Sequence, residues 1–373
     1  MPVRVQMLDP SAFTPPYDHA LCAALAAAGA DVELVTSRFA YGAVPPPAGY
    51  AVRESFYRWA PGAPGSALRR AAKLAQHVPD MLAWRRHAAQ ADVVHFQWLT
   101  VQPLDWRLLP RRRADGGPRP LVLTAHDVLP REPRPGQLAA QRRLYDRVDA
   151  VVVHSEHGRA RLTGALGVDP ARVRVIPHGA FAHLAAQAQE APLPRELAEV
   201  DGPVVLCFGL MRPYKGIDVL LEAWRGIDGA ELWVVGMPRM DLAPLQAAAP
   251  PGVRFVPRFV GDAELPAFFR RADLVVLPYR EIDQSGVLFT ALAFGAPLLL
   301  SDVGGFPEVA ATGAAELVAA GDAGALHGAL TALLADPDRR AGLGAAAHAA
   351  AAGPYAWDAI ARQHLELYAE LLR

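Results

Sequence analysis

The chain has 373 residues, 52% of them hydrophobic, with a formal net charge of −1 and two cysteines. This length is too great for one ordinary core and fits two α/β domains of about 150 to 200 residues each, both well filled. No uninterrupted apolar run reaches the roughly 18 residues that cross a bilayer. Cys22 and Cys207 fall in different predicted domains, so neither a disulfide framework nor a zinc site is expected.

The first half of the chain alternates apolar strand candidates with helical patterns, which include Asp18–Ala28 and Gly136–Arg147. The strand candidates are Val3–Leu8, Asp31–Thr36, Val93–Phe96, Leu121–Thr124, Ala150–His154 and Val173–Ile176. This alternation predicts a doubly wound parallel sheet. Because the first candidate starts almost at the initiator methionine, it leaves no room for a secretory signal, and we expect a cytoplasmic protein.

The second half repeats the alternation after residues 182–202, which contain no clear element and are predicted to form a linker. Its strand candidates are Val204–Phe208, Glu231–Gly236, Val253–Val256, Leu274–Leu277 and Pro297–Ser301, followed by helices. We therefore expect Rossmann-like domains at 1–185 and 200–352, with a closing helix at 353–373 that returns to the first domain. Two such domains would face each other across a cleft lined by strand carboxyl ends, where open α/β sheets bind ligands.

The two halves carry opposite charge, with a net of +7 over residues 1–190 and −8 over the remainder. The basic residues of the first half gather at Arg69, Arg70, Lys73, Arg85, Arg86 and Arg111–Arg113, with Leu68, Leu74, Val78, Met81, Leu82 and Trp84 between them. This pattern is compatible with an amphipathic segment on an anionic membrane surface at the inner face of the cell membrane, and equally with a solvated helix face. Nucleic acid is not an expected partner, because no binding motif accompanies the charge.

The segment Phe208–Trp224, FGLMRPYKGIDVLLEAW, is the most informative of the chain. A short apolar strand ends at Gly209, and Arg212 and Lys215 follow before an amphipathic helix begins. A strand-to-helix turn offers free backbone N–H groups and the positive end of the helix, and here it also carries two fixed cations. This arrangement predicts a phosphate-binding site.

Segments along the whole chain resemble those of the retaining family-4 glycosyltransferases, known also as glycosyl transferases group 1, which have the GT-B fold. The resembling segments are PPYDHALCAALAAAGADVELVT, VVHFQWL, TAHDVLP, VVVHSEHGRARL, RVIPHGAF, FGLMRPYKGIDVLLEAW, ELWVVGMP, ADLVVLPYREIDQSGVLFTALAFGAPLLLSDVGGFPE and YAWDAIARQHLELYAELL. Each is moderately specific alone, but their order and spacing together are strong. The resemblance implies two Rossmann-like domains that hold a nucleotide-sugar between them.

On this resemblance, Lys215 is the lysine that binds the donor diphosphate. The family's R-x4-K arginine would fall at Leu210, so we expect Arg212, displaced by two residues, to supply the charge. Backbone N–H groups of Gly286 and Val287 would cap the donor phosphates. The remaining donor-binding candidates are Gly209, Gly236, Arg258 and Ser285.

The family's E-x7-E pair is altered in this chain. Its second glutamate, which holds the nucleotide ribose, falls on Thr290, whose hydroxyl could make only part of that contact. The first falls at Ile282, so Glu281 or Asp283 on either side would contact the transferred sugar.

Candidate residues of the first domain follow its strands. The resemblance makes His126 a contact of the donor sugar, while His95 and Trp98 are candidate acceptor contacts, with a core or rim role equally open. In the amino-terminal loop, Tyr17 and Asp18 are further acceptor candidates, and Asp18 is the expected N-cap of the first helix.

The resemblance implies transfer with retention, front-face departure of the diphosphate and no divalent metal or cofactor. The substrates would be a nucleotide-diphosphate-sugar and a hydroxyl acceptor, which could be lipid-linked. Arg212, Lys215 and the Gly286 amide would stabilise charge on the leaving diphosphate. Two alternatives remain open at this point: a degenerate member that binds a nucleotide-sugar or a protein partner without turnover, and a non-hydrolysing sugar-nucleotide epimerase.

Overall fold

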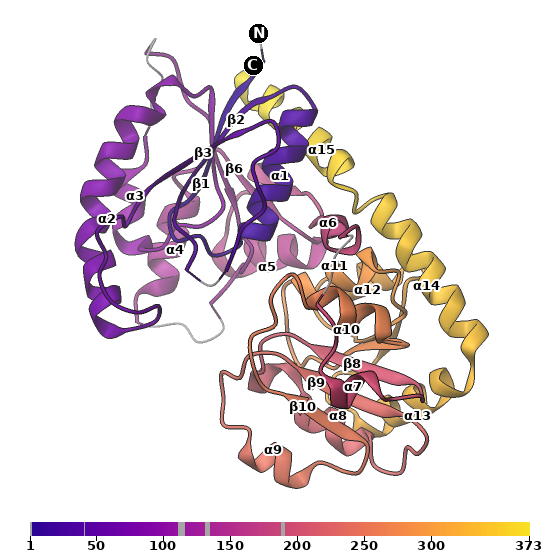
Figure 1. Ribbon diagram of the computed structural model, residues 1–373. Coiled ribbons are helices and arrows are strands. Elements are labelled where there is room, and N and C mark those ends of the chain that lie inside the picture. The colour runs from indigo at the N-terminus through magenta and orange to yellow at the C-terminus, as the bar shows by residue number, and fades with distance from the viewer. Residues whose placement is uncertain (1, 41, 111–115, 131–134, 188–190) are drawn as a thin grey trace. The chain divides into compact units, whose positions relative to one another are not determined.

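The computed structural model describes residues 2–40, 42–110, 116–130, 135–187 and 191–373. The chain divides into two compact units (Figure 1). Unit 1 comprises Met1–Pro177 together with Trp357–Arg373, and unit 2 comprises His178–Ala356. Each unit is built around its own parallel sheet, as the alternation of strands and helices predicted.

The sheet of unit 1 has the strand order β3-β2-β1-β4-β5-β6-β7, with all neighbours parallel. Its strands are β1 (Arg4–Asp9), β2 (Asp31–Ser37), β3 (Ala51–Phe56), β4 (Val93–Phe96), β5 (Leu121–Thr124), β6 (Ala150–Val153) and β7 (Val173–Val175). Every residue of β4, β5 and β6 is buried, because helices cover both faces of the sheet. Helices α2 and α3 lie on one side, and α1 and α15 on the other (Figure 1).

The sheet of unit 2 has the order β10-β9-β8-β11-β12-β13, again parallel throughout. Its strands are β8 (Val204–Phe208), β9 (Glu231–Val235), β10 (Val253–Val256), β11 (Leu274–Leu277), β12 (Leu298–Ser301) and β13 (Ala315–Val318). The buried side chains of β8, β9 and β11 pack with those of α8 and α13 in one apolar cluster that contains Trp224.

The helices of the two units are mostly short. In unit 1 they are α1 (Pro15–Ala27), α2 (Ala67–His87), α3 (Gln102–Leu108), α4 (Gln137–Tyr145), α5 (Glu156–Leu166) and α15 (Trp357–Leu372), with the 3-10 turns Ala88–Gln90 and Pro170–Arg172. In unit 2 they are α6 (Ala182–Ala185), α7 (Arg195–Ala198), α8 (Ile217–Ala223), α9 (Ala243–Ala248), α10 (Leu265–Arg271), α11 (Gly286–Ala293), α12 (Phe306–Ala310), α13 (Ala323–Ala335) and α14 (Pro337–Ala352), with the 3-10 turn Pro213–Lys215.

Three expectations need correction. The residues 182–202, predicted to form a structureless linker, contain α6 and α7, which are only one turn each and leave little periodic pattern. Strands β3 and β13 were not predicted, because each is an edge strand whose partly exposed residues form no apolar run. The division between the units falls after Pro177, earlier than the expected boundary at 185.

The C-terminal helix α15 completes unit 1, where it packs beside α1 (Figure 1). The Tyr368 hydroxyl lies 2.6 Å from Nδ1 of His95, whose Nε2 lies 2.7 Å from the Thr124 hydroxyl. His95 is fully buried, and burial holds its pKa well below the usual range. The expectation that His95 could contact the acceptor is therefore wrong, because both of its ring nitrogens serve the contact between helix and sheet.

Buried histidines make the stability of unit 1 dependent on pH. Burial lowers the pKa of His364, on α15, to about 4, whereas the unfolded chain has the ordinary value of 6.5. The stabilising effect of a neutral His364 is complete above the unfolded pKa and is lost as the pH falls toward the folded one. Each such histidine therefore opposes folding in mild acid.

Replacing His364 by leucine should remove this contribution. Between about pH 7 and about pH 5 the wild type should lose about 2 kcal/mol more stability than His364→Leu, since other titrating groups are common to both proteins. Urea unfolding at the two pH values measures the difference. His348→Leu, which changes an exposed histidine of α14, serves as the control, and an equal acid loss in all three proteins would contradict the prediction.

Candidate functional site

In unit 2, the turn after β8 is held tightly against the turn after β9. The N–H of Gly209 donates to the Val235 carbonyl at 2.9 Å, and the N–H of Met211 donates to Met237 at 3.0 Å. Gly236, with φ of +139°, faces the Gly209 carbonyl so closely that a Cβ would lie 2.0 Å from its oxygen. No side chain fits there, so Gly236 is fixed by the close approach of two backbones.

The buried Lys215 ammonium is fixed by an aromatic partner. Its Nζ donates to the Tyr279 hydroxyl at 2.6 Å and lies 4.3 Å from the centre of that ring. Tyr279 is fully buried just after β11, and its hydroxyl is 3.5 Å from Oγ of Ser285, the residue that precedes α11. The ammonium is therefore held near the amino end of α11.

The predicted phosphate-binding groups come together at this point. A Cβ built on Gly209 would lie 3.0 Å from Cγ2 of Val287 and 3.3 Å from Nζ of Lys215. The first turn of α11 and the lysine ammonium thus both lie close to Gly209. Gly286 and Val287 are the first residues of that helix, so their backbone N–H groups have no intrahelical partners. Gly209, Lys215, Ser285, Gly286 and Val287 form what we call the unit 2 cradle.

A second set of contacts holds the Arg212–Lys215 turn to the segment after β11. Gly216, at φ of +66°, lies so near Pro278 that a Cβ would be 2.0 Å from its carbonyl oxygen. Arg280 bonds the Pro213 carbonyl at 3.0 Å and the Asp218 carboxylate at 2.6 and 2.8 Å. Arg212 begins the turn, and its exposed guanidinium has no hydrogen-bond partner among the residues the structure describes.

In unit 1, a cluster of rings lies at the carboxyl ends of β4, β5 and β6. Half-buried His126 stacks on Trp98, with ring centres 5.1 Å apart and planes at 18°. Its Nε2 is 2.9 Å from Oε1 of Gln97, and its Nδ1 is 3.1 Å from Nε2 of His154. Since His154 Nδ1 donates to the Ile176 carbonyl, its Nε2 accepts, and both nitrogens of His126 face acceptors. These contacts fix the orientation of the His126 ring.

The amino-terminal loop differs from expectation. Thr14, and not Asp18, is the N-cap of α1; its hydroxyl donates to Asp18 at 3.3 Å and accepts from the Trp98 indole at 2.9 Å. Tyr17 and Asp18 are buried, Tyr17 edge-on against His126. Burial, and then the charge of neighbouring Asp9, raise the pKa of Asp18 well above its ordinary value. Neither side chain lies at the surface, so the expected acceptor contacts reduce to Trp98.

Comparison with known proteins decides the family. Residues 17–180 match the family described as Glycosyltransferase Family 4, and residues 202–336 match Glycosyl transferases group 1. Over 312 residues the chain is 31% identical to D-inositol 3-phosphate glycosyltransferase of Nocardia farcinica, covering 75% of this chain and 67% of that protein. The chain belongs to glycosyltransferase family 4.

A second relative of this glycosyltransferase is the GDP-mannose-dependent alpha-(1-6)-phosphatidylinositol monomannoside mannosyltransferase of Mycobacterium tuberculosis. The two are 29% identical over 294 residues, which covers 74% of this chain and 76% of that protein. Among solved structures, sucrose-phosphate synthase from Thermosynechococcus elongatus superposes with a TM-score of 0.77 at 22% identity, over 99% of each chain. This likeness shows the GT-B fold that the sequence predicted.

Other candidate residues of the glycosyltransferase lie around the unit 2 cradle. Glu281 is exposed and Asp283 is buried, with 5% of its surface accessible. The Thr290 hydroxyl donates to the Gly286 carbonyl at 3.0 Å, so it could offer a ribose only its lone pairs. Arg258 is exposed and its guanidinium is paired with Glu264 at 2.7 and 2.9 Å. A role for these four in donor binding stays a prediction.

Sequence reasoning missed Gln97, His154 and Thr14, which hold His126 and Trp98 in place. Two of them follow buried strands directly, and polar residues at such positions were the available signal.

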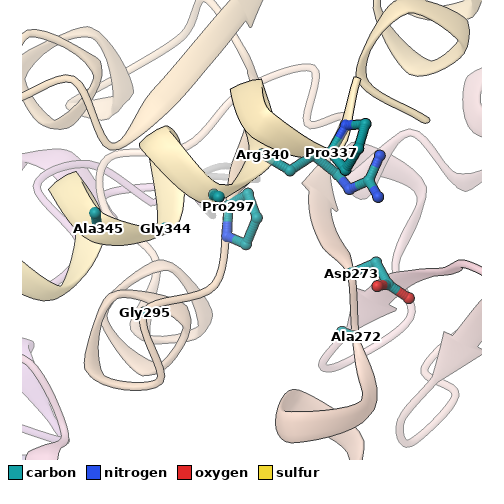
Figure 2. Close-up of a pocket in the computed structure, with 9 residues that line it drawn as sticks. Ala272, Asp273, Gly295, Pro297, Pro337, Arg340, Gly344 and Ala345 are labelled. Atoms are coloured by element: carbon teal, nitrogen blue, oxygen red, sulfur yellow. The ribbon is translucent and has the colours of Figure 1, made fainter. Parts of the chain in front are cut away.

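A surface hollow between α14 and the loops entering β11 and β12 (Figure 2) belongs to the amino edge of the second sheet, opposite the cradle. Its Asp273 is engaged structurally, accepting from the Val204 N–H at 2.8 Å.

The described residues form neither a metal-ligand cluster nor a membrane-spanning helix. Within residues 2–40, 42–110, 116–130, 135–187 and 191–373, no three histidine, cysteine or acidic side chains gather as metal ligands would. The helices of these ranges include none with the length and apolar content of a membrane span.

Substitution of Gly236 should disturb the cradle more than an ordinary glycine replacement. Gly236→Ala should lower the stability of unit 2 by about 1 to 3 kcal/mol beyond the cost of a positive φ, because the Gly209 carbonyl must move. Gly226→Ala is the matched control, since that glycine has φ of +80° but nothing within 4 Å of a Cβ. Thermal unfolding of both variants tests this, and equal losses would show that the two turns are not locked together.

Proposed function

We propose that this glycosyltransferase moves a sugar from a nucleoside-diphosphate sugar to a hydroxyl acceptor, with retention and without a divalent metal. The observation that carries the proposal is the unit 2 cradle, where the Lys215 ammonium and Val287 in the first turn of α11 both lie close to Gly209. A diphosphate there would meet fixed positive charge and N–H donors, while Gly209 leaves room for its close approach.

In this proposal the cradle does the main work of catalysis. Negative charge grows on the diphosphate as the bond to the sugar breaks, and Lys215 and the amides already point at it. The Tyr279 hydroxyl fixes the ammonium, so little reorganisation is needed when the charge develops. Arg212, exposed at the start of the turn, would add a mobile guanidinium. These cations would supply the charge neutralisation that a metal provides elsewhere.

Unit 1 would hold the acceptor at the Trp98–His126 surface. The flat Trp98 ring can stack on a sugar or alcohol, and His126, which we expect to contact the donor sugar, is held rigidly beside it. In front-face transfer a phosphate oxygen of the leaving group takes the acceptor proton, so no carboxylate nucleophile is required. Glu281 and Asp283 would contact the transferred sugar. The names of the relatives make GDP-mannose the first donor to test.

Loss of the lysine should weaken donor binding. Lys215→Ala should weaken the binding of a nucleoside diphosphate by about 1.5 to 3 kcal/mol, the scale of a lost charged hydrogen bond. Arg212→Ala should cost about 0.5 to 1 kcal/mol, because an exposed cation is screened by water. Calorimetry with GDP and UDP measures both.

The control is Arg225→Ala, which removes an exposed cation of unit 2 away from the cradle. Unchanged affinity in the Lys215 and Arg212 variants would remove the phosphate assignment. Donor binding with no transfer to any hydroxyl acceptor would instead favour a nucleotide-sugar-binding protein.

We also propose that helix α2 docks on anionic membrane at the inner face of the cytoplasmic membrane, where a lipid-linked acceptor would be found. Leu68 and Leu74 on its outer face are 62% and 57% exposed, and Trp59 beside it is 82% exposed. Arg70 and Arg86 accompany them on the exposed surface. Arg69 turns inward to the Ala60 carbonyl, and Arg111–Arg113 lie outside the described residues.

Vesicle binding tests this surface. Sedimentation with phosphatidylglycerol vesicles should be strong at low salt and fall steeply as salt is added, because exposed charges are screened over about 8 Å at physiological ionic strength. The double variant Arg70→Glu/Arg86→Glu should lose it, whereas Arg195→Glu/Arg362→Glu, with the same change of charge on other surfaces, should not. A wild type that ignores vesicles at low salt would leave α2 as a solvated helix.

A further inference from the structure

Lysine is nearly absent from this chain, and its two occurrences share a geometry. Among 37 basic residues only Lys73 and Lys215 are lysines. Lys215 Nζ lies 4.3 Å from the centre of the Tyr279 ring, and Lys73 Nζ lies 4.6 Å from the centre of the Tyr57 ring. In a sequence that otherwise uses arginine, a compact ammonium over an aromatic face is a specific choice at both places. The proposed function uses Lys215 and leaves Lys73 unexplained.

The tyrosine beneath Lys73 is held by a buried chain of hydrogen bonds. The Tyr57 hydroxyl is 2.7 Å from Nδ1 of His77, and His77 Nε2 is 2.5 Å from the Asp105 carboxylate. His77 and Asp105 are fully buried, and the second oxygen of Asp105 accepts the Val101 N–H at 2.8 Å. Tyr57 itself has φ of +54°, a strained value for a residue other than glycine. Such strain collects at functional sites.

Two hydroxyl groups complete the cluster at the carboxyl edge of the sheet. Ser11 follows β1 and Thr100 follows β4, and their side-chain oxygens are 3.3 Å apart. Burial raises the pKa of the Tyr57 phenol to about 12, and the nearby side chains of Thr100 and Ser11 act to lower it. Thr100 lies two positions beyond Trp98 on the same loop, so the cluster continues the Trp98–His126 surface.

The half-buried ammonium of Lys73 has no ion-pair partner among the described residues, and Asp9 compensates its charge only in part. Burial, and then the nearby Arg69 guanidinium, lower the pKa of Lys73, while Asp9 acts in the opposite sense. The Asp9 carboxylate is itself engaged by the N–H groups of Ser11 and Phe13. A bound anion would supply the missing counter-charge.

We propose that Lys73, Ser11 and Thr100 bind a phosphate group carried by the acceptor, with Tyr57 as the positioning residue. The ammonium and the two hydroxyls offer donors in several directions, which suit the three free oxygens of a tetrahedral phosphate better than the two coplanar oxygens of a carboxylate. A hydroxyl of the same molecule would then reach the Trp98–His126 surface. This inference rests on the proposed function, because it names the acceptor of that reaction.

The scarcity of lysine makes a direct test possible. Reductive methylation with ¹³C-formaldehyde labels the two lysines and the amino terminus, and Lys73→Arg and Lys215→Arg assign the two lysine signals. GDP is first added until the Lys215 signal no longer moves. Inorganic phosphate is then titrated at constant ionic strength. The Lys73 signal should shift and saturate, and acetate should shift it less.

Variants and probes define the site further. Tyr57→Phe, which keeps the ring but frees His77, should weaken the phosphate response at Lys73, and Arg362→Ala on α15 should not. Hexose 6-phosphate and phosphatidylglycerol vesicles separate a soluble acceptor from a lipid headgroup, because only the bound source should displace inorganic phosphate. With a phosphorylated acceptor, Lys73→Ala should lower kcat/KM roughly ten- to hundred-fold, mainly through KM.

The two proposals fail separately. If GDP moves Lys215 but no phosphate compound moves Lys73, the acceptor subsite is wrong and the donor cradle stands. If GDP leaves Lys215 unmoved, the donor assignment fails whatever Lys73 does. An equal response of Lys73 to acetate and phosphate would overturn the phosphate specificity.

Discussion

A parallel strand that is buried on both faces can present a polar side chain to solvent only where it ends. In this protein the interior strands are short, buried and mostly apolar, and the few polar residues within them, such as His95 and Thr124, are buried and bonded to one another, so chemistry is confined to the residues that follow the strands. Asp9, Gln97, His126 and His154 occupy such positions in unit 1, as do Gly209 and Tyr279 in unit 2. Since all strands of a sheet run in the same direction, these residues lie at the same edge of their sheet.

The lysine–tyrosine pair is a second recurring element. An ammonium over an aromatic ring keeps its charge while giving up part of its hydration, and a hydroxyl at the ring edge fixes where it points. Arginine would spread the same charge over a wide plane and could not be held by one hydroxyl. Both units place an ammonium over a tyrosine ring, and in unit 2 the tyrosine hydroxyl also accepts a hydrogen bond from it.

How far sequence reasoning reached depended on burial. Central strands such as Val93–Phe96 and Leu274–Leu277 were predicted to the residue, because burial on both faces leaves a run that is wholly or mostly apolar. The edge strands β3 and β13 were not predicted, since many of their residues are exposed to solvent and form no apolar run. Lys215 and Gly286 could be placed from a strand, a glycine and a helix in succession. The role of His95 could not be predicted, because its partner Tyr368 lies 273 residues away in the sequence and no local pattern indicates the contact. Asp18 was misjudged for a related reason, as its buried carboxyl group interacts with Asp9 at the end of β1 and does not cap the helix.

The docking of α15 has a consequence for how the chain is made. Unit 1 needs Trp357–Arg373, yet the ribosome must first produce all of His178–Ala356. At common synthesis rates this leaves the partly built sheet waiting for roughly 10 to 40 s, with the surface of α1 and the ring of His95 uncovered. Unit 2 is contiguous and can fold during that interval. A chain that stops short therefore exposes apolar surface in its oldest part, which lets chaperones and proteases recognise an unfinished molecule by its first domain.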